Sequence, residues 1–204
     1  MTDPLAREPD ESLLARYRRG DTSVFKELVR RHQRGLFNFA LRQVHAPSTA
    51  EDIVQEVFVR VVQNVESFKE EARFATWAYT IARNLCIDHL RKRVHRRHAS
   101  LDAPAGPDSS DAPLVERVAG GTDEAADRAA IGRQLGTHIA AAVERLPDDQ
   151  REVFLLRHLG ELAFKEIAEI VGTNENTVKS RMRYALERLQ AALAEYEDYA
   201  RVTR

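Results

Sequence analysis

A change in composition near the middle of the chain constrains its fold more than any other feature. Residues 100–122 hold three prolines and three glycines among acidic and small residues, and they offer too little apolar area to fold alone. The segments on either side are rich in Ala, Leu, Glu and Arg, a composition that favours helices. The sequence therefore predicts two helical parts joined by a flexible linker.

Apolar residues on both sides of the linker recur at the 3.6-residue period of an amphipathic helix, and no segment alternates as a strand does. Ser48 with Glu51 three residues later is typical of a capping box, which marks a helix start. The expected helices cover residues 11–19, 22–44, 48–65, 73–95, 123–146, 148–158, 163–171 and 176–196. We predict an all-α protein with small helical domains at 8–97 and 128–196, joined by a flexible acidic linker at 98–127.

Charge is unevenly distributed, although the formal net charge is only −1. Residues 83–98 contain six arginines or lysines and one aspartate, whereas residues 100–127 contain seven acidic residues and one arginine. A basic block beside an acidic block indicates a polyanion-binding surface next to a solvated tether. The distribution of charge, and not its total, therefore indicates the class of partner.

Several classes of protein are disfavoured. Cys86 is the only cysteine, so an intrachain disulfide is impossible. The N-terminus lacks a signal pattern and no apolar run is long enough to span a bilayer, so we expect a cytoplasmic protein without membrane insertion. Cys86 and His89 lie three apart on an expected helix, but a structural zinc needs four ligands, and a buried thiol is the simpler interpretation. Without a phosphate loop, nucleophile elbow or catalytic carboxylate pair, we expect no cofactor, no small-molecule substrate and no enzymatic activity.

The strongest structural motif is a pair of short helices joined by a tight turn near the C-terminus. Gly172 can take the positive φ that closes the first helix. The inner faces are expected to consist of Phe164, Ile167, Ala168, Ile170, Val178, Met182, Ala185, Leu186 and Leu189. The outer face of the second helix carries Thr177, Lys179, Ser180, Arg181, Arg183, Tyr184 and Arg188. Such donors suit the major groove of DNA, so the pattern predicts a helix-turn-helix; a solvated basic face on a helical hairpin is the alternative.

The N-terminal part offers two further surfaces. Trp77, Ile81 and Leu85 recur at i, i+4 and i+8 and are expected to pack in the core. Aromatic, basic and amide side chains that suit an unstacked single strand fall beside this stripe or in the preceding loop: Phe68, Arg73, Thr76, Tyr79, Arg83 and Asn84. The third expected helix has a polar face of Glu51, Asp52, Gln55, Glu56 and Arg60, for which a solvated acidic surface is the alternative.

Three sets of segments, in order along the chain, resemble those of one family. Residues 50–58 resemble the polymerase-binding segment of bacterial sigma factors, and residues 74–77, 81–84 and 87–88 resemble their −10 promoter segment. Residues 146–147, 166–168 and 177–181 resemble their −35-binding domain. The two-domain layout, with no domain between them, resembles the extracytoplasmic-function (ECF) group of the sigma-70 family, group 4. Two departures bear on packing: Ala78 stands where members usually carry leucine, and Ala163 leaves one helix cap unassigned.

The resemblance implies an alternative sigma factor that binds core RNA polymerase and directs initiation at −35 and −10 promoter elements. It implies contacts of Asp52, Gln55 and Glu56 with the clamp of the largest subunit. It implies contacts at or near the melted −10 strand for Phe68, Arg73, Phe74, Tyr79, Arg83 and Asn84. Contacts with the −35 duplex are implied for Thr177, Lys179, Ser180, Arg181, Arg183 and Tyr184. Further expected partners are the flap of the second-largest subunit and a separate anti-sigma protein, and the acidic linker is expected on the RNA-exit side of the polymerase.

A stand-alone helix-turn-helix regulator is the alternative function. Such a protein shares the DNA-binding motif but needs a sensor or dimerisation domain. The N-terminal half shows no phosphoacceptor strand pattern and no obvious ligand pocket. Salt-dependent promoter binding in the absence of polymerase would favour the regulator.

Overall fold

The computed structural model describes residues 4–69, 72–99 and 135–194, which are helices and the short segments between them. The N-terminal helices are α1 (Asp10–Arg18), α2 (Phe25–Val44), α3 (Pro47–Gln63) and α4 (Phe74–Ala99), with 3₁₀ turns η1 (Pro4–Arg7), η2 (Thr22–Val24) and η3 (Val65–Ser67). Further along, residues 135–144 are helical and are followed by α6 (Asp148–Leu159), α7 (Phe164–Val171) and α8 (Glu175–Leu193). The all-α prediction is confirmed.

The chain divides into two compact units. The first contains residues 1–107 and 155–175, and the second contains residues 108–154 and 176–204. The predicted linker at 98–127 lies outside the described residues except for its first two, which belong to α4. The proposed domain boundaries therefore remain predictions.

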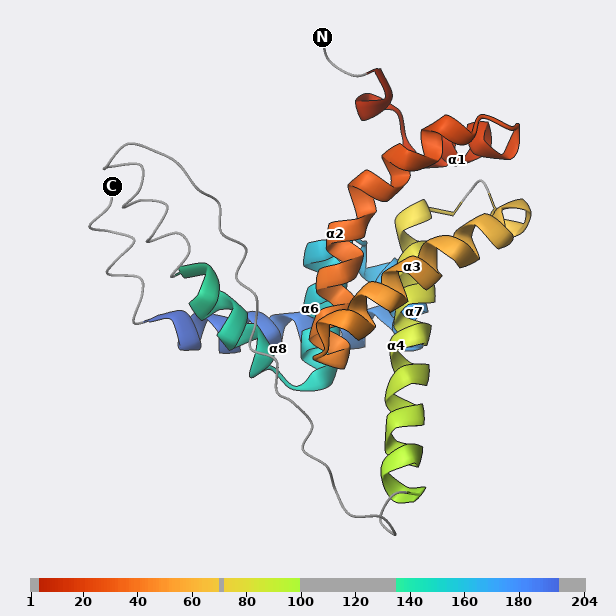
Figure 1. Ribbon diagram of the computed structural model, residues 1–204. Helices are drawn as coiled ribbons and strands as arrows, with labels where there is room; N and C mark the ends of the chain where they lie inside the picture. The colour runs from red at the N-terminus through yellow and green to blue at the C-terminus, as the bar shows by residue number, and fades with distance from the viewer. Residues whose placement is uncertain (1–3, 70–71, 100–134, 195–204) are drawn as a thin grey trace, which may run out of the picture. The chain divides into compact units, whose positions relative to one another are not determined.

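Within the first unit, α2, α3 and α4 pack against one another, and α1 packs on α2 (Figure 1). The inward side chains recur at helical spacing, as the sequence pattern predicts. The fully buried ones include Leu13 of α1, Leu36 and Phe39 of α2, Val57 of α3 and Ala78 of α4. This interior holds α3 and α4 with their outer faces accessible.

The start of α3 differs from the prediction. The helix begins at Pro47, and Ala46 is its N-cap without a side-chain hydrogen bond, so the capping box of Ser48 and Glu51 is wrong. Proline suits the first helical position because that amide has no intrahelical acceptor and the ring already fixes φ. The chain reaches this start through His45, which ends α2 in the left-handed conformation with φ 56°.

The inward face of α4 also differs from the prediction. Trp77, Ile81 and Leu85 are only partly buried, whereas the buried stripe consists of Phe74, Ala75, Ala78, Tyr79, Ala82 and Cys86. Three alanines on this stripe allow close approach of α4 to its neighbours, and the flanking rings then fill the interior. The Tyr79 ring packs edge-on against Phe39 with centroids 5.5 Å apart.

A glycine inside α2 provides the space for Tyr79. A Cβ atom added at Gly35 would lie 2.6 Å from the Tyr79 hydroxyl oxygen, closer than van der Waals contact permits. Glycine in a helix interior is unfavourable by about 1 kcal/mol relative to alanine. The close approach of Tyr79 explains why α2 has a glycine at this position.

The two helices of the predicted helix-turn-helix begin and end within two or three residues of their expected bounds. Gly172 follows α7 with φ 72°, and its amide bonds to the carbonyl of Ala168 at 3.0 Å. This left-handed residue closes α7 and leads into α8, as expected. At the start of α7, the carboxylate of Glu166 accepts a hydrogen bond from the backbone amide of Ala163 at 2.6 Å. That bond supplies the cap that the sequence left unassigned.

None of the helices among the described residues is long and apolar enough to cross a membrane.

Candidate protein and nucleic-acid interfaces

The outer face of α3 carries the residues expected to bind a protein partner. Asp52 and Gln55 are exposed, and Glu56 is half-buried. The Glu56 carboxylate bonds to Arg60 Nε at 2.8 Å, one turn further along the helix. Asp52 and Gln55 therefore present polar groups to solvent, while Arg60 partly neutralises Glu56.

Two valines extend this face and were missed in the sequence. Val59 is 46% exposed and Val62 is 39% exposed. Positions 52, 55, 59 and 62 follow the i, i+3, i+7 and i+10 spacing of one helix face. An exposed apolar strip bordered by polar groups is typical of a protein-docking surface. The signal in the sequence was the presence of five valines, at 54, 57, 59, 61 and 62, which are too many for one buried stripe.

The start of α4 contains the residues expected at single-stranded DNA, and two of them are not on the surface. Phe74 is fully buried and Tyr79 is 1% exposed. The Phe74 ring lies 4.9 Å from the His32 ring in an edge-on contact. Burial raises the pKa of the Tyr79 phenol, which keeps it neutral. Neither ring is accessible to a base in this conformation, and contact of Phe74 and Tyr79 with the −10 strand stays a prediction.

The accessible side chains at this end of α4 form a different set. Asn84 and Arg73 are exposed, and Arg83 is half-buried. Trp77 is half-buried and packs against Phe68, with ring centroids 5.2 Å apart. Phe68 itself is mostly covered. The candidate single-strand surface therefore consists of Arg73, Arg83 and Asn84 beside the edge of Trp77, which sequence reasoning assigned to the core.

Glu166 occupies part of this surface within the first unit. Thr76 Oγ1 donates to its Oε1 at 2.6 Å, and Arg73 Nη1 lies 3.2 Å from its Oε2. Burial would raise the pKa of Glu166, but the hydrogen bonds from Thr76 and Ala163 and the charge of Arg73 lower it. The carboxylate is thus held in its charged form against the start of α4.

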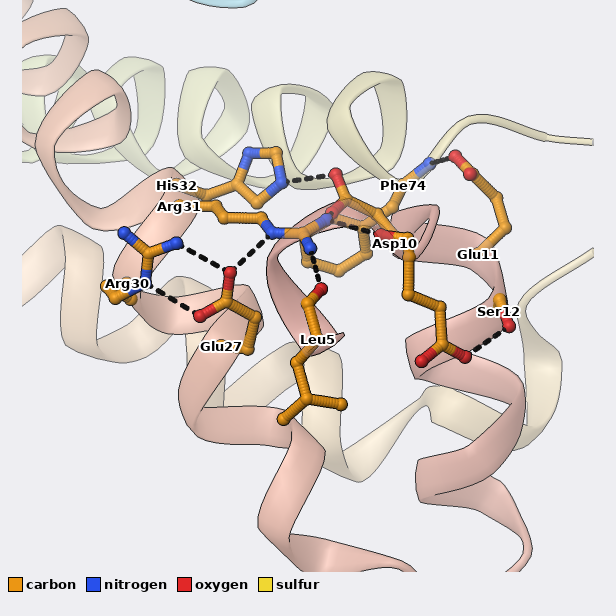
Figure 2. A network of polar contacts seen from close by, with 10 residues as sticks. Leu5, Asp10, Glu11, Ser12, Glu27, Arg30, Arg31, His32 and Phe74 are labelled. Carbon is orange, nitrogen blue, oxygen red and sulfur yellow. Dashed lines mark hydrogen bonds and ion pairs between the residues drawn. The ribbon is translucent and has the colours of Figure 1, made fainter. Parts of the chain in front are cut away.

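A network of charged side chains reaches the start of α4 through Asp10 and His32, whose ring contacts Phe74. Arg31 Nη1 donates to Asp10 Oδ1 at 2.6 Å and to the Glu8 carbonyl at 2.7 Å, and its Nε donates to Glu27 at 2.8 Å. Glu27 also accepts two hydrogen bonds from Arg30. Figure 2 shows Asp10, Glu27 and Leu5 converging on the Arg31 guanidinium. The network joins η1 and α1 to α2.

The network should make folding stability depend on pH. Hydrogen bonds from Arg30 and Arg31 lower the pKa of Glu27 to about 2, from an ordinary value of 4.5. A carboxyl whose pKa is lower in the folded state than in the unfolded state stabilises the fold. This stabilisation is complete at pH values above the unfolded-state pKa and is lost as the pH falls through the folded-state pKa. We expect the free energy of unfolding, measured by urea titration, to fall between about pH 4.5 and 2. Glu27→Gln should reduce this slope, and an unchanged slope would contradict the assignment.

The outer face of α8 holds the residues expected at duplex DNA. Lys179, Ser180, Arg183 and Tyr184 are exposed, and Thr177 is half-buried. The inner face consists of Val178, Met182, Ala185 and Leu189, all buried. Leu186, placed inside from the sequence, is instead 51% exposed.

Two basic side chains of this face already have partners. Arg181 Nε lies 3.0 Å from Asp149, so Arg181 ties α8 to the start of α6. The Arg183 guanidinium lies over the Tyr184 ring, 4.7 Å from its centroid. This stacking presents a planar cation beside an aromatic edge, a combination suited to phosphate and base contacts.

The possible metal ligands lie on the buried side of α4. Cys86 is buried and His89 is half-buried. Burial and the nearby charges of Arg96, Arg93 and Lys92 lower the pKa of His89. Within the described ranges, no three His, Cys, Asp or Glu side chains are grouped as metal ligands would be.

Comparison with known proteins gives matches to both parts of the chain. The family model for Sigma-70 region 2 matches residues 28–96, and that for Sigma-70 region 4 matches residues 137–189. The RNA polymerase sigma-H factor of Pseudomonas aeruginosa is 31% identical over 93% of this chain and 96% of its own length. The ECF RNA polymerase sigma factor SigW of Bacillus subtilis is 32% identical over 86% of this chain and 92% of its own.

A solved structure is similar as well. The sigma factor RpoE of Bartonella quintana, in complex with the anti-sigma factor NepR, superposes with a TM-score of 0.64 at 25% identity. The match covers 83% of this chain and 96% of that one.

Proposed function

Because this chain belongs to the ECF group of the sigma-70 family of RNA polymerase sigma factors, we propose that it binds core RNA polymerase and directs transcription initiation at promoters with −35 and −10 elements. The observation that carries this proposal is the presence of region 2, at residues 28–96, followed by region 4, at residues 137–189, in one chain. A stand-alone regulator would instead combine the helix-turn-helix with a sensor or dimerisation domain.

Polymerase binding is assigned to the outer face of α3. Asp52 and Gln55 supply exposed polar groups, and Glu56 supplies a carboxylate held by Arg60. The exposed Val59 adds apolar area that loses water on docking. A surface with an apolar centre and a polar rim fits the clamp of the largest subunit, and region 4 is assigned to the flap of the second-largest subunit.

Recognition of the −10 element is assigned to the start of α4. Flipping a base out of the duplex costs a few kcal/mol, which contacts in a pocket offset. Arg73, Arg83 and Asn84 supply the donors, and Trp77 supplies the aromatic edge, with the largely covered Phe68 packed against its ring. Phe74 and Tyr79 are assigned a supporting role beneath this surface, since their rings are buried.

Recognition of the −35 element is assigned to the outer face of α8. Lys179, Ser180, Arg183 and Tyr184 face outward on a helix whose inner side is anchored by buried apolar residues. Thr177 lies near the N-terminal end of α8, where hydroxyls and helix amides favour a phosphate. Arg181 is expected to contact DNA only after exchanging its bond with Asp149.

The protein is further proposed to act in the cytoplasm as a non-enzymatic factor under the control of an anti-sigma protein. A structurally similar sigma factor, RpoE of Bartonella quintana, was solved with such a partner. The exposed valines of α3 offer an apolar surface that such a protein can cover, which would block the polymerase. The proposed domains are residues 8–97 and 128–196, with an acidic linker at 98–127.

In vitro transcription tests the function directly. Purified core polymerase is mixed with this protein on a genomic promoter library, and the RNA start sites are mapped. We expect discrete start sites that require both components and share two upstream elements. If the protein is folded and the polymerase is cognate, but no such start sites arise, the sigma assignment is wrong. Salt-dependent promoter binding without polymerase would then favour the regulator.

A further inference from the structure

The segment formed by residues 5–12 contacts the start of α4. It precedes residues 28–96, which the region 2 model matches. Glu11 Oε1 accepts a hydrogen bond from the backbone amide of Phe74 at 2.9 Å (Figure 2). That amide is among the first of α4, which have no acceptor inside their own helix. A carboxylate at this position also interacts favourably with the helix dipole, so Glu11 acts as a cap supplied by a different helix.

The neighbouring Asp10 acts on Phe74 through His32. Asp10 Oδ2 lies 2.6 Å from His32 Nε2, and the His32 ring packs edge-on against the Phe74 ring. Burial would raise the pKa of Asp10, but hydrogen bonds from His32 and Arg31 lower it. Arg31 also bonds to the carbonyls of Leu5 and Glu8, which anchors the segment that carries both carboxylates.

Phe74 lies between residues assigned to −10 recognition. Arg73 precedes it directly, and Trp77 follows one turn later on the same helix. Any change in the path of the first turn of α4 therefore moves these side chains. Binding groups that are held in place before the ligand arrives lose less freedom when it binds.

We propose that Glu11 and Asp10 are positioning residues for recognition of the −10 element. Glu11 fixes the backbone of the first turn of α4, and Asp10 fixes the Phe74 ring through His32. Neither carboxylate contacts DNA in this role. The inference rests on the proposed sigma function and adds to it a segment outside the matched region.

The test compares two activities of full-length Glu11→Ala on a promoter found in the transcription library. The first is the affinity for core polymerase. The second is promoter opening by the holoenzyme, which is measured by the permanganate reactivity of the −10 thymines. We expect promoter opening to fall about five-fold, because the variant loses one charged helix cap. The affinity for core polymerase should change less than two-fold. Glu11→Gln retains an acceptor oxygen and should keep most of the opening.

Glu8→Ala is the matched control. The Glu8 side chain belongs to the same segment and bonds to Ser12 at 2.6 Å and Arg16 at 2.8 Å, both on α1. Glu8→Ala should lower thermal stability about as much as Glu11→Ala does, and it should leave promoter opening at the wild-type level. Equal opening by Glu11→Ala and wild type would overturn the positioning role, as would equal defects in Glu8→Ala and Glu11→Ala. A defect in Glu11→Gln as large as in Glu11→Ala would also overturn it, by pointing to charge alone. Absence of start sites with the wild type would instead overturn the proposed function itself.

Discussion

Arg31→Met is expected to lower the free energy of unfolding by about 3 kcal/mol, the largest effect of any single substitution in the charged network. The Arg31 side chain is 19% exposed, and its partner Glu27 is 6% exposed. Removing the guanidinium leaves the Glu27 and Asp10 carboxylates with fewer partners, away from water. It also frees the carbonyls of Leu5 and Glu8. Urea unfolding at neutral pH measures the difference.

Arg30→Met provides the control because Arg30 bonds to the same Glu27 carboxylate. Its side chain is 62% exposed, so solvent can replace it and the loss should stay below about 1 kcal/mol. Adding Glu27→Gln to Arg31→Met should recover part of the lost stability, since a neutral amide is less costly to bury than an unpaired charge. Similar losses for Arg30→Met and Arg31→Met would show that the network contributes only as a surface ion pair.

The sequence predicts the elements of this fold well because each is defined by local chemistry. The helical period, Gly172 at the end of α7 and the order of the helices were all predictable from short windows. Gly35 shows the limit of this approach. A glycine in a helix interior signals a close approach, but nothing local identifies the Tyr79 hydroxyl, 44 positions further along, as the atom that approaches it.

The candidate sites show the same limit more strongly. On α4, the i, i+4 and i+8 spacing of Trp77, Ile81 and Leu85 assigned Trp77 to the core and left Tyr79 beside the stripe. The alanines at 75, 78 and 82 decide the question, because a face of small residues lets two helices approach closely and draws the adjacent rings inside. The ring of Trp77 then lies at the margin, where it is useful for binding. The role of Glu11 depends on a contact between residues 63 positions apart, which no local pattern reveals.

The exposed strip of α3 leads to the largest expected functional effect. Val59→Asp should weaken binding to core polymerase about 30-fold, because it places a charge at the centre of an apolar docking strip. Gln55→Ala combined with Glu56→Arg should abolish polymerase-dependent start sites by removing a polar contact and reversing a charge on the same face. Since Val59 is 46% exposed in the free protein, its replacement should change the free energy of unfolding by less than about 0.5 kcal/mol. Binding is measured by titrating labelled protein with core polymerase.

Lys179→Ala separates polymerase binding from DNA binding. Lys179 is exposed on α8, so its loss should leave affinity for core polymerase unchanged while weakening promoter binding by the holoenzyme. Val59→Asp should show the opposite pattern, because a variant that does not join the polymerase cannot be brought to the promoter. Wild-type affinity of Val59→Asp for the polymerase would exclude the valine strip from the interface. The polar residues Asp52, Gln55 and Glu56 would then have to account for docking alone, although one of them is already bonded to Arg60.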